Sequence, residues 1–141
     1  MKQLTMRNQQ QEVAIDTPAL RRQMRWLLDK ALNWSEYEIM VRFVSAKCMA
    51  KLNHKHLSHK GPTDVITFDY EEPTRIGEIV ICPAVAAVNA QHHNESIMVE
   101  LARYLVHGLL HMSGYDDKTS AERGEMKREE DRLLRRLLNN G

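Results

Sequence analysis

The sequence predicts a single α+β domain over residues 1–141, with a small mixed β-sheet of about three to five strands packed against helices. Short β-rich segments alternate with segments of helical periodicity, and neither an internal repeat nor a linker divides the chain. The composition, 43% hydrophobic and 28% charged, suits a domain that buries its own core. Residues 97–112 are apolar on nearly every side, which is typical of a helix covered by its neighbours. We therefore expect this helix to be central and buried.

The first third of the chain contains two candidate edge strands, at residues 4–6 and 13–15, separated by a Gln-rich turn. Thr17 followed by Pro18 marks the start of a helix, because threonine is a favourable N-cap and proline fits the first helical position. The alternation of apolar and polar residues over 37–44 then predicts a half-buried strand.

A basic surface is expected between residues 39 and 63, where the sequence has no acidic side chain. Ser45 should cap a helix there, and three lysines that recur every fourth residue would form one stripe on it. Such a stripe can follow a nucleic-acid backbone, or it can be an ordinary solvated face that pairs with acids elsewhere. The candidate nucleic-acid contacts are Lys47, Lys51, Lys55 and Lys60.

Three histidines near this stripe share no helical face, so we expect His54, His56 and His59 to be polar loop residues rather than a second metal site. Pro62 should open a turn after them, and Asp64 should bond the backbone there.

The rest of the chain continues the alternation of strands and helices. We expect strands at residues 65–69 and 79–81, joined by a hairpin loop at residues 71–75, and a helix that starts at Pro83. Residues 119–138 should form a final amphipathic helix whose charged residues are a solvent face without a functional role. Its expected inward side chains are Met126, Leu133, Leu134, Leu137 and Leu138.

The central helix carries the residues that point to chemistry. His107 and His111 are four positions apart, so their rings project from one face and can converge on one point. Gly114 can stop the helix in a left-handed cap, after which Asp117 can return toward both imidazoles. Two imidazoles and a carboxylate suit zinc, and three protein ligands leave a position open for water. The alternative is that both histidines are core residues bonded to the backbone and Asp117 is an exposed turn residue.

Two neighbouring positions bear on this site. Zinc peptidases of the H-E-x-x-H type place a catalytic glutamate directly after the first histidine, where this chain has Gly108. The glycine makes proteolysis the less favoured chemistry and indicates that something packs closely against the helix or that a substrate needs the room. Glu78 is either an ordinary strand-face residue, which we favour, or a group that orients a metal-bound histidine.

The segment from His107 to Asp117, His-Gly-Leu-Leu-His-Met-Ser-Gly-Tyr-Asp-Asp, closely resembles the H-G-x-L-H-x-x-G-Y-D-H signature of the YbeY family of bacterial rRNA maturation endoribonucleases. Residues 62–68 resemble the P-T-D-V-L-S-F stretch of that family, residues 77–82 resemble its following strand, and Asn53 matches its L-N element. The order and spacing agree from about Val41 to Asp131.

This resemblance implies a single-domain, zinc-dependent hydrolase that cleaves single-stranded RNA and acts on ribosomal RNA and ribosomal subunits. It implies His107 and His111 as catalytic residues and, with Asp117, as ligands of one Zn²⁺ per chain, although another divalent ion is possible. If the chain acts on RNA, the four lysines of the basic surface are its candidate contacts.

Two departures from the family pattern affect these expectations. Asp117 stands where the usual third ligand is histidine, and Asp116 is an adjacent competitor for that role. Leu57 stands where many members carry an arginine thought to act on the RNA. Two alternatives therefore remain: a non-catalytic ribosome-assembly factor with a structural metal and, less favoured, a zinc metallopeptidase.

The cellular setting is predicted from two further features. No apolar run approaches the roughly 20 residues that cross a bilayer, and the N-terminus lacks the apolar stretch of a secretory signal, so we expect a cytoplasmic protein without a membrane partner. Cys48 and Cys82 are expected to be small buried residues rather than a disulfide.

Overall fold

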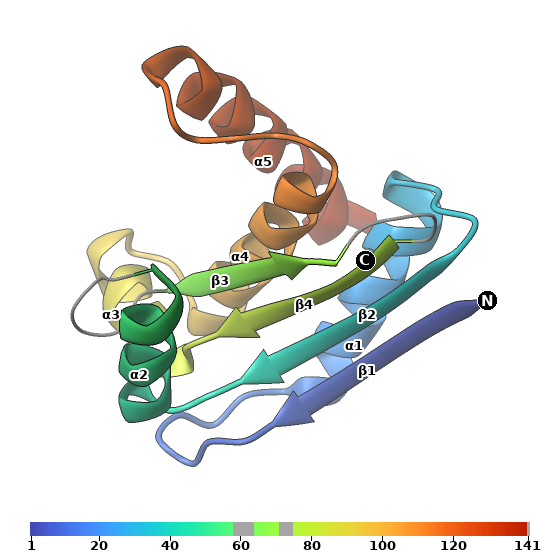
Figure 1. Ribbon diagram of the computed structural model, residues 1–141. Helices are drawn as coiled ribbons and strands as arrows, with labels where there is room; N and C mark the ends of the chain where they lie inside the picture. The colour runs from blue at the N-terminus through green and yellow to red at the C-terminus, as the bar shows by residue number, and fades with distance from the viewer. Residues whose placement is uncertain (58–63, 71–74, 141) are drawn as a thin grey trace.

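The computed structural model describes residues 1–57, 64–70 and 75–140 of the chain (Figure 1). It confirms the predicted α+β domain with a four-stranded mixed sheet. The strands are β1 (Lys2–Asn8), β2 (Tyr37–Phe43), β3 (Val65–Asp69) and β4 (Arg75–Ile81). The helices of this described part are α1 (Thr17–Trp26), extended by the π-helical turn η1 (Leu27–Ala31), α2 (Ala46–Leu57), α3 (Pro83–His92), α4 (Ile97–Met112) and α5 (Ser120–Asn140).

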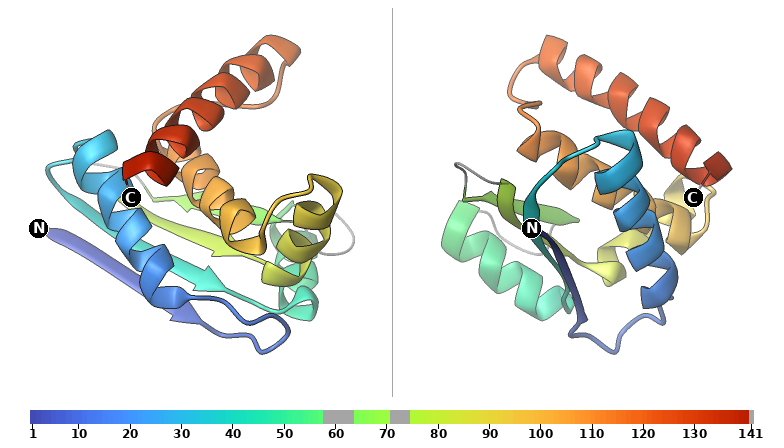
Figure 2. Two further views of the ribbon diagram at one scale, coloured as in Figure 1. Left: turned by 180° about the vertical axis from the view of Figure 1, so that it is seen from behind. Right: turned by 90° about the vertical axis from the view of Figure 1, so that its right-hand side faces the viewer.

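The sheet has the strand order β1-β2-β4-β3, with β1, β2 and β4 parallel and β3 antiparallel to β4. Side chains alternate across β2, so that Tyr37, Ile39, Val41 and Phe43 are buried on one face. Helices α1 and α4 cover that face, and α5 packs over α4 (Figure 2). Helix α2 covers part of the opposite face, where Met49 packs with Ile66 and Val80.

Helix α4 is the central, buried helix, as predicted. Leu101, Ala102 and Leu105 are fully buried, and the helix contacts α3, α5, β3 and β4. A Cβ atom at Gly108 would lie 2.8 Å from the Cδ1 atom of Ile79, so the glycine lets the helix lie directly on β4. Close packing is therefore the reason for the glycine at this position.

A left-handed cap ends α4, as predicted. Gly114 has a φ of 103°, the backbone N–H of Tyr115 donates to the carbonyl of Leu110, and that of Gly114 donates to the carbonyl of His111. This pair of bonds is a Schellman motif, which satisfies the last carbonyls and reverses the chain. The cap brings residues 115–117 back toward the helix.

The expected strand at residues 13–15 is wrong. The side chain of Gln10 accepts a hydrogen bond from the N–H of Val13 at 2.9 Å and donates to its carbonyl at 2.9 Å, so both backbone groups are used locally instead of in a ladder. The N-cap of α1 is Asp16 rather than Thr17, because the Asp16 carboxylate accepts from the N–H of Ala19.

Other expectations for local structure are confirmed. Ser45 caps α2 by accepting from the N–H of Cys48 at 3.1 Å, and Asp64 accepts from the N–H of Val65 at 2.7 Å. Helix α3 starts at Pro83. Cys48 and Cys82 are both free, with Cys82 buried and Cys48 partly buried.

Two details differ from the sequence prediction. Helix α2 continues to Leu57, so His54 and His56 are helical instead of lying in a loop. Leu138, expected to point inward on α5, is 49% exposed, whereas the other four expected side chains, including the adjacent Leu137, are buried. Residues His59, Lys60 and Pro62 and most of the predicted hairpin loop lie outside the described residues.

Within the described ranges, no helix combines the length and apolar character required to cross a membrane.

Two helical glycines allow a matched test of the packing of α4. Gly108→Ala should lower the free energy of unfolding, because overpacking against Ile79 costs about 1–3 kcal/mol and exceeds the roughly 0.5–1 kcal/mol gained in helix propensity. Gly124→Ala in α5 should raise the free energy of unfolding, because its Cβ would meet the flexible Arg128 side chain at 3.5 Å, an ordinary van der Waals distance. Urea denaturation of both variants measures the difference, and a stabilised Gly108→Ala variant would contradict this account.

Candidate metal centre

Three residues meet at the C-terminal end of α4. The rings of His107 and His111 lie edge to face with centroids 4.9 Å apart. Asp117, returned by the cap, has its Oδ2 atom 3.7 Å from Nε2 of His111. One possible ligand atom from each residue lies within 4.8 Å of the others, so the structure brings together the three residues that the sequence singled out. The cluster can hold a divalent metal ion.

The cluster opens onto a cleft of about 490 Å³ between α4 and β3. Val65, Thr67 and Asp69 alternate along β3, so all three face the helix and line the cleft. The side chains of His107 and His111 are 26% and 28% exposed, and that of Asp117 is 49% exposed. The cluster is thus reachable from solvent, with room for a substrate group beside it.

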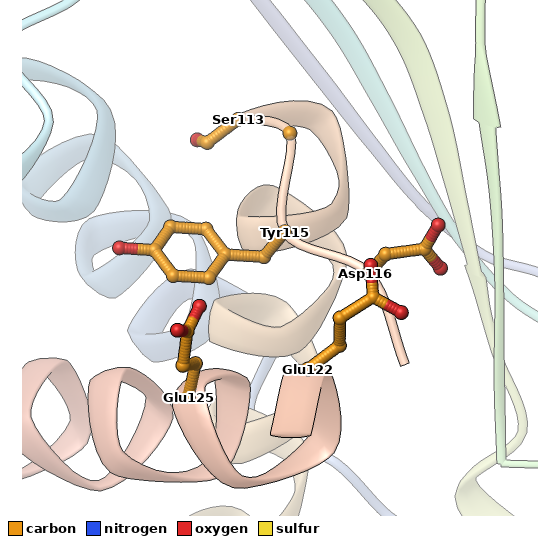
Figure 3. Close-up of a pocket in the computed structure, with 6 residues that line it drawn as sticks. Ser113, Tyr115, Asp116, Glu122 and Glu125 are labelled. Carbon is orange, nitrogen blue, oxygen red and sulfur yellow. The ribbon is translucent and has the colours of Figure 1, made fainter. Parts of the chain in front are cut away.

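Asp116 does not belong to this cluster. Its Oδ1 atom accepts a hydrogen bond from the N–H of Asp117, and its Oδ2 atom lies 3.7 Å from Nζ of Lys118. It lines a different hollow, of about 330 Å³, together with Tyr115, Glu122 and Glu125 (Figure 3). Of the two adjacent aspartates, Asp117 is therefore the one placed to bind an ion held by the histidines.

Glu130 of α5 is a site residue that the sequence analysis missed. Its Oε2 atom lies 2.8 Å from Nδ1 of His107, and the residue is only 7% exposed. The prediction that the charged residues of this helix serve only as a solvent face is therefore wrong. A signal was present in the helical spacing, because position 130 falls on the stripe formed by Met126, Leu133 and Leu137.

Glu78 is an ordinary strand-face residue, as favoured. Its carboxylate pairs with Arg42 at 3.2 Å and accepts a hydrogen bond from the hydroxyl of Tyr70. Its neighbour Gly77 faces Met112 at the end of α4, so Glu78 points to the other face of the sheet. It cannot orient either histidine.

The two imidazoles have different electrostatic environments. Burial lowers the pKa of His107, but its hydrogen bond to Glu130 and the charge of that carboxylate outweigh burial, so the pKa lies above its ordinary value. For His111, burial and the neighbouring His107 lower the pKa, although Asp117 and a backbone hydrogen bond with Tyr115 oppose this. His111 therefore offers an unprotonated ring at neutral pH.

The candidate RNA contacts lie elsewhere on the molecule. Lys47, Lys51 and Lys55 are exposed on α2, which covers the face of the sheet opposite to α4 and ends near the start of β3 (Figure 1). Lys60 lies outside the described residues. The lysine stripe and the histidine cluster are thus separated by the sheet.

Comparison with known proteins gives the chain a family. The family model described as Endoribonuclease YbeY matches residues 5–138. This chain belongs to the YbeY family. A relative named Endoribonuclease YbeY from Salinispora tropica is 35% identical over 136 residues, which cover 85% of this chain and 87% of the relative. A relative of the same name from Elusimicrobium minutum is 36% identical over 106 residues, covering 71% and 74%.

The fold is also that of a solved structure. The solution structure of a Thermotoga maritima protein matches with a TM-score of 0.70 at 24% identity, covering 96% of this chain and 89% of that one. The family model and the curated relatives confirm the predicted resemblance to the YbeY family. Because the YbeY relatives are named as endoribonucleases, membership supports a hydrolase that acts on RNA.

The adjacent aspartates provide a matched test of the ion site in this YbeY-family chain. Asp117→Asn should weaken Zn²⁺ binding by about tenfold or more, because even groups that only support a ligand contribute roughly 10–100-fold. Asp116→Asn removes the same charge one residue away and should leave the affinity within about twofold of the parent, because the Asp116 carboxylate lines a different hollow and approaches Lys118. Isothermal titration calorimetry on metal-free protein measures both, and the reverse order of affinities would transfer the ligand role to Asp116.

Proposed function

We propose that this chain is a metal-dependent endoribonuclease that cleaves phosphodiester bonds of single-stranded RNA. Its substrate would be ribosomal RNA, in ribosome maturation or quality control in the cytoplasm, with ribosomal subunits as partners. The observation that carries this proposal is the cluster of His107, His111 and Asp117 at an open cleft. Family membership supports the RNA substrate.

The donor set fits zinc. Imidazole nitrogen and carboxylate oxygen are ordinary zinc ligands, and catalytic zinc sites have three protein ligands, whereas structural sites are closed by four. When bound, such an ion supplies Lewis acidity and lowers the pKa of a coordinated water to near neutrality. We assign the ligand role to His107, His111 and Asp117, and the two histidines would act in catalysis as ligands of that ion.

The packing of Gly108 argues against peptidase chemistry. In H-E-x-x-H peptidases the residue after the first histidine supplies the general base. Here that position lies against Ile79 of β4, so it faces the sheet instead of the cleft. No side chain at position 108 could reach a bound water without moving the helix. An ester substrate with its own nucleophile, such as RNA, does not require a base at this position.

A ribosome-assembly factor with a structural metal is the second candidate, and one observation favours it. Leu57 stands where many family members carry an arginine. Without that charge the chain could hold an ion and bind the ribosome without cleaving RNA. Two observations favour catalysis: the cluster opens onto a cleft, and it offers three candidate ligands among the described residues, as catalytic zinc sites do.

Cleavage of an end-labelled ribosomal RNA fragment tests the proposal. The purified parent should cleave it, and the His107→Ala/His111→Ala variant should lose nearly all of the activity, because it loses two of three ligands. A circular-dichroism melt of the metal-free variant serves as the folding control.

Each other outcome has a defined meaning. Equal cleavage by both proteins would indicate a contaminant or another site and would reject this one. Zinc binding by the parent without cleavage would leave the assembly factor as the better account. Casein cleavage that a chelator abolishes would revive the peptidase.

The lysine stripe can be tested by salt dependence. The triple variant Lys47→Gln/Lys51→Gln/Lys55→Gln should bind RNA more weakly, and the slope of log affinity against log salt should fall by about 2, since each phosphate contact on a single strand contributes roughly 0.7. The turnover number at saturating RNA should not change, because these lysines lie across the sheet from the histidines.

The control is a second triple variant, which loses the same three positive charges from other surfaces of the molecule. Arg22, Lys30 and Arg135 are exposed on α1, η1 and α5. Their combined substitution by glutamine should leave the salt slope unchanged. Equal slopes in both triple variants would mean that α2 does not track the RNA.

A further inference from the structure

Glu130 occupies a position that packing alone does not explain. It lies on the apolar stripe of α5 with only 7% of its surface exposed, whereas leucine or methionine occupies the neighbouring stripe positions. Burying a carboxylate is costly unless hydrogen bonds and opposite charges compensate for its lost hydration. The partners of Glu130 should therefore indicate why a carboxylate is present there.

The two oxygens of Glu130 have different partners. Oε2 lies 2.8 Å from Nδ1 of His107, and Oε1 lies 3.5 Å from Nη1 of Arg103. Both partners belong to α4, one turn apart, so the carboxylate is held between two successive turns of the facing helix. Lys127 also approaches Oε1, at 3.9 Å, but it is 60% exposed and such pairs contribute little.

Arg103 is itself fixed in place. Its side chain is 15% exposed, and its guanidinium lies 3.2 Å from Glu95, 3.4 Å from Glu100 and 3.1 Å from Asp131. Glu100 is buried and also accepts a hydrogen bond from the hydroxyl of Tyr104. Because Arg103 has these other partners, its position does not depend on Glu130, and it forms a fixed support for that carboxylate.

The contact with Glu130 determines which nitrogen of His107 is available. With Nδ1 directed at the carboxylate, Nε2 is the ring nitrogen left for a ligand. A carboxylate that accepts from Nδ1–H fixes the tautomer and the ring orientation, and it makes the imidazole a better donor to a metal.

We infer that Glu130 is the positioning residue for His107, and that Arg103 and Glu130 together orient this imidazole so that Nε2 faces the ion site. The inference rests on the proposed metal centre, which it deepens by adding a residue from α5. It makes the docking of α5 on α4 a requirement for ion binding as well as for stability.

Two substitutions of Glu130 test the inference. Glu130→Ala removes the side chain, and Glu130→Met fills the same space without an oxygen, which protects the fold if the alanine variant is unstable. In both, Zn²⁺ affinity, measured by competition with a chromophoric chelator, should fall by about 10–100-fold. The control is Asp131→Asn, which also removes a carboxylate next to Arg103 but does not contact His107; its affinity should stay within about twofold of the parent.

A second readout does not depend on the ion. The ¹⁵N chemical shifts of the His107 ring, recorded on metal-free protein at alkaline pH, should report the proton on Nδ1 in the parent and in Asp131→Asn. In Glu130→Met the proton should move to Nε2, while the melting temperature stays close to that of the parent. A purely structural role for Glu130 would not move these shifts in a folded protein.

The outcomes separate this inference from the proposed function. If the parent binds zinc and Glu130→Met binds it equally tightly with the proton still on Nδ1, the positioning role is wrong and the metal centre stands. If the parent binds no zinc that depends on His107 and His111, the metal centre itself fails. If Asp131→Asn loses as much affinity as Glu130→Met, the effect belongs to the Arg103 cluster instead of to the contact with His107.

Discussion

The contact between Gly108 and Ile79 is the constraint on which the site depends. It places α4 directly on β4, closer than any side chain at position 108 would permit without displacing Ile79. Position 108 faces the sheet. Helical geometry then directs the side chains of residues 107 and 111 to a different side of α4, the side that borders β3. The cleft exists because β3 supplies its other wall.

A buried helix that carries charged groups must satisfy them from its neighbours. Glu100, Arg103 and Tyr104 of α4 bond one another or reach acids on α5 and on the segment before α4. An unpaired group in such a place would cost about 1–3 kcal/mol, so this network favours a single docking of α5. The histidines belong to the same helix, and Glu130 joins one of them to the network.

The sheet separates the two features that the sequence analysis made candidates for RNA binding and catalysis. The histidine cluster and its cleft lie on the face covered by α4, whereas the lysine stripe lies on α2, across the sheet. An RNA that used both would have to pass around the edge formed by β3, which α2 precedes in the chain. Under the proposed function, this geometry would suit an extended single strand better than a compact duplex, because a flexible strand can bend around an edge.

The sequence by itself determined what depends on local periodicity and local capping. The H-x-x-x-H spacing of α4, the left-handed Gly114, the Ser45 cap and the strand alternation of β2 all follow from neighbours within about one helical turn or a few strand residues. Even the local prediction failed at Val13, where the side chain of Gln10 competes for the backbone.

Only the tertiary structure decided which distant groups meet. Glu130 and His107 are 23 positions apart on different helices, and nothing local distinguishes Glu130 from the other acids of α5 except its place on the apolar stripe. The face of the sheet that α2 covers was likewise set by how the elements pack, and the turn of the chain after the cap is what places Asp117, rather than Asp116, beside the histidines. The physical reason is that spacing fixes which side chains share a face, whereas packing between elements fixes what that face meets.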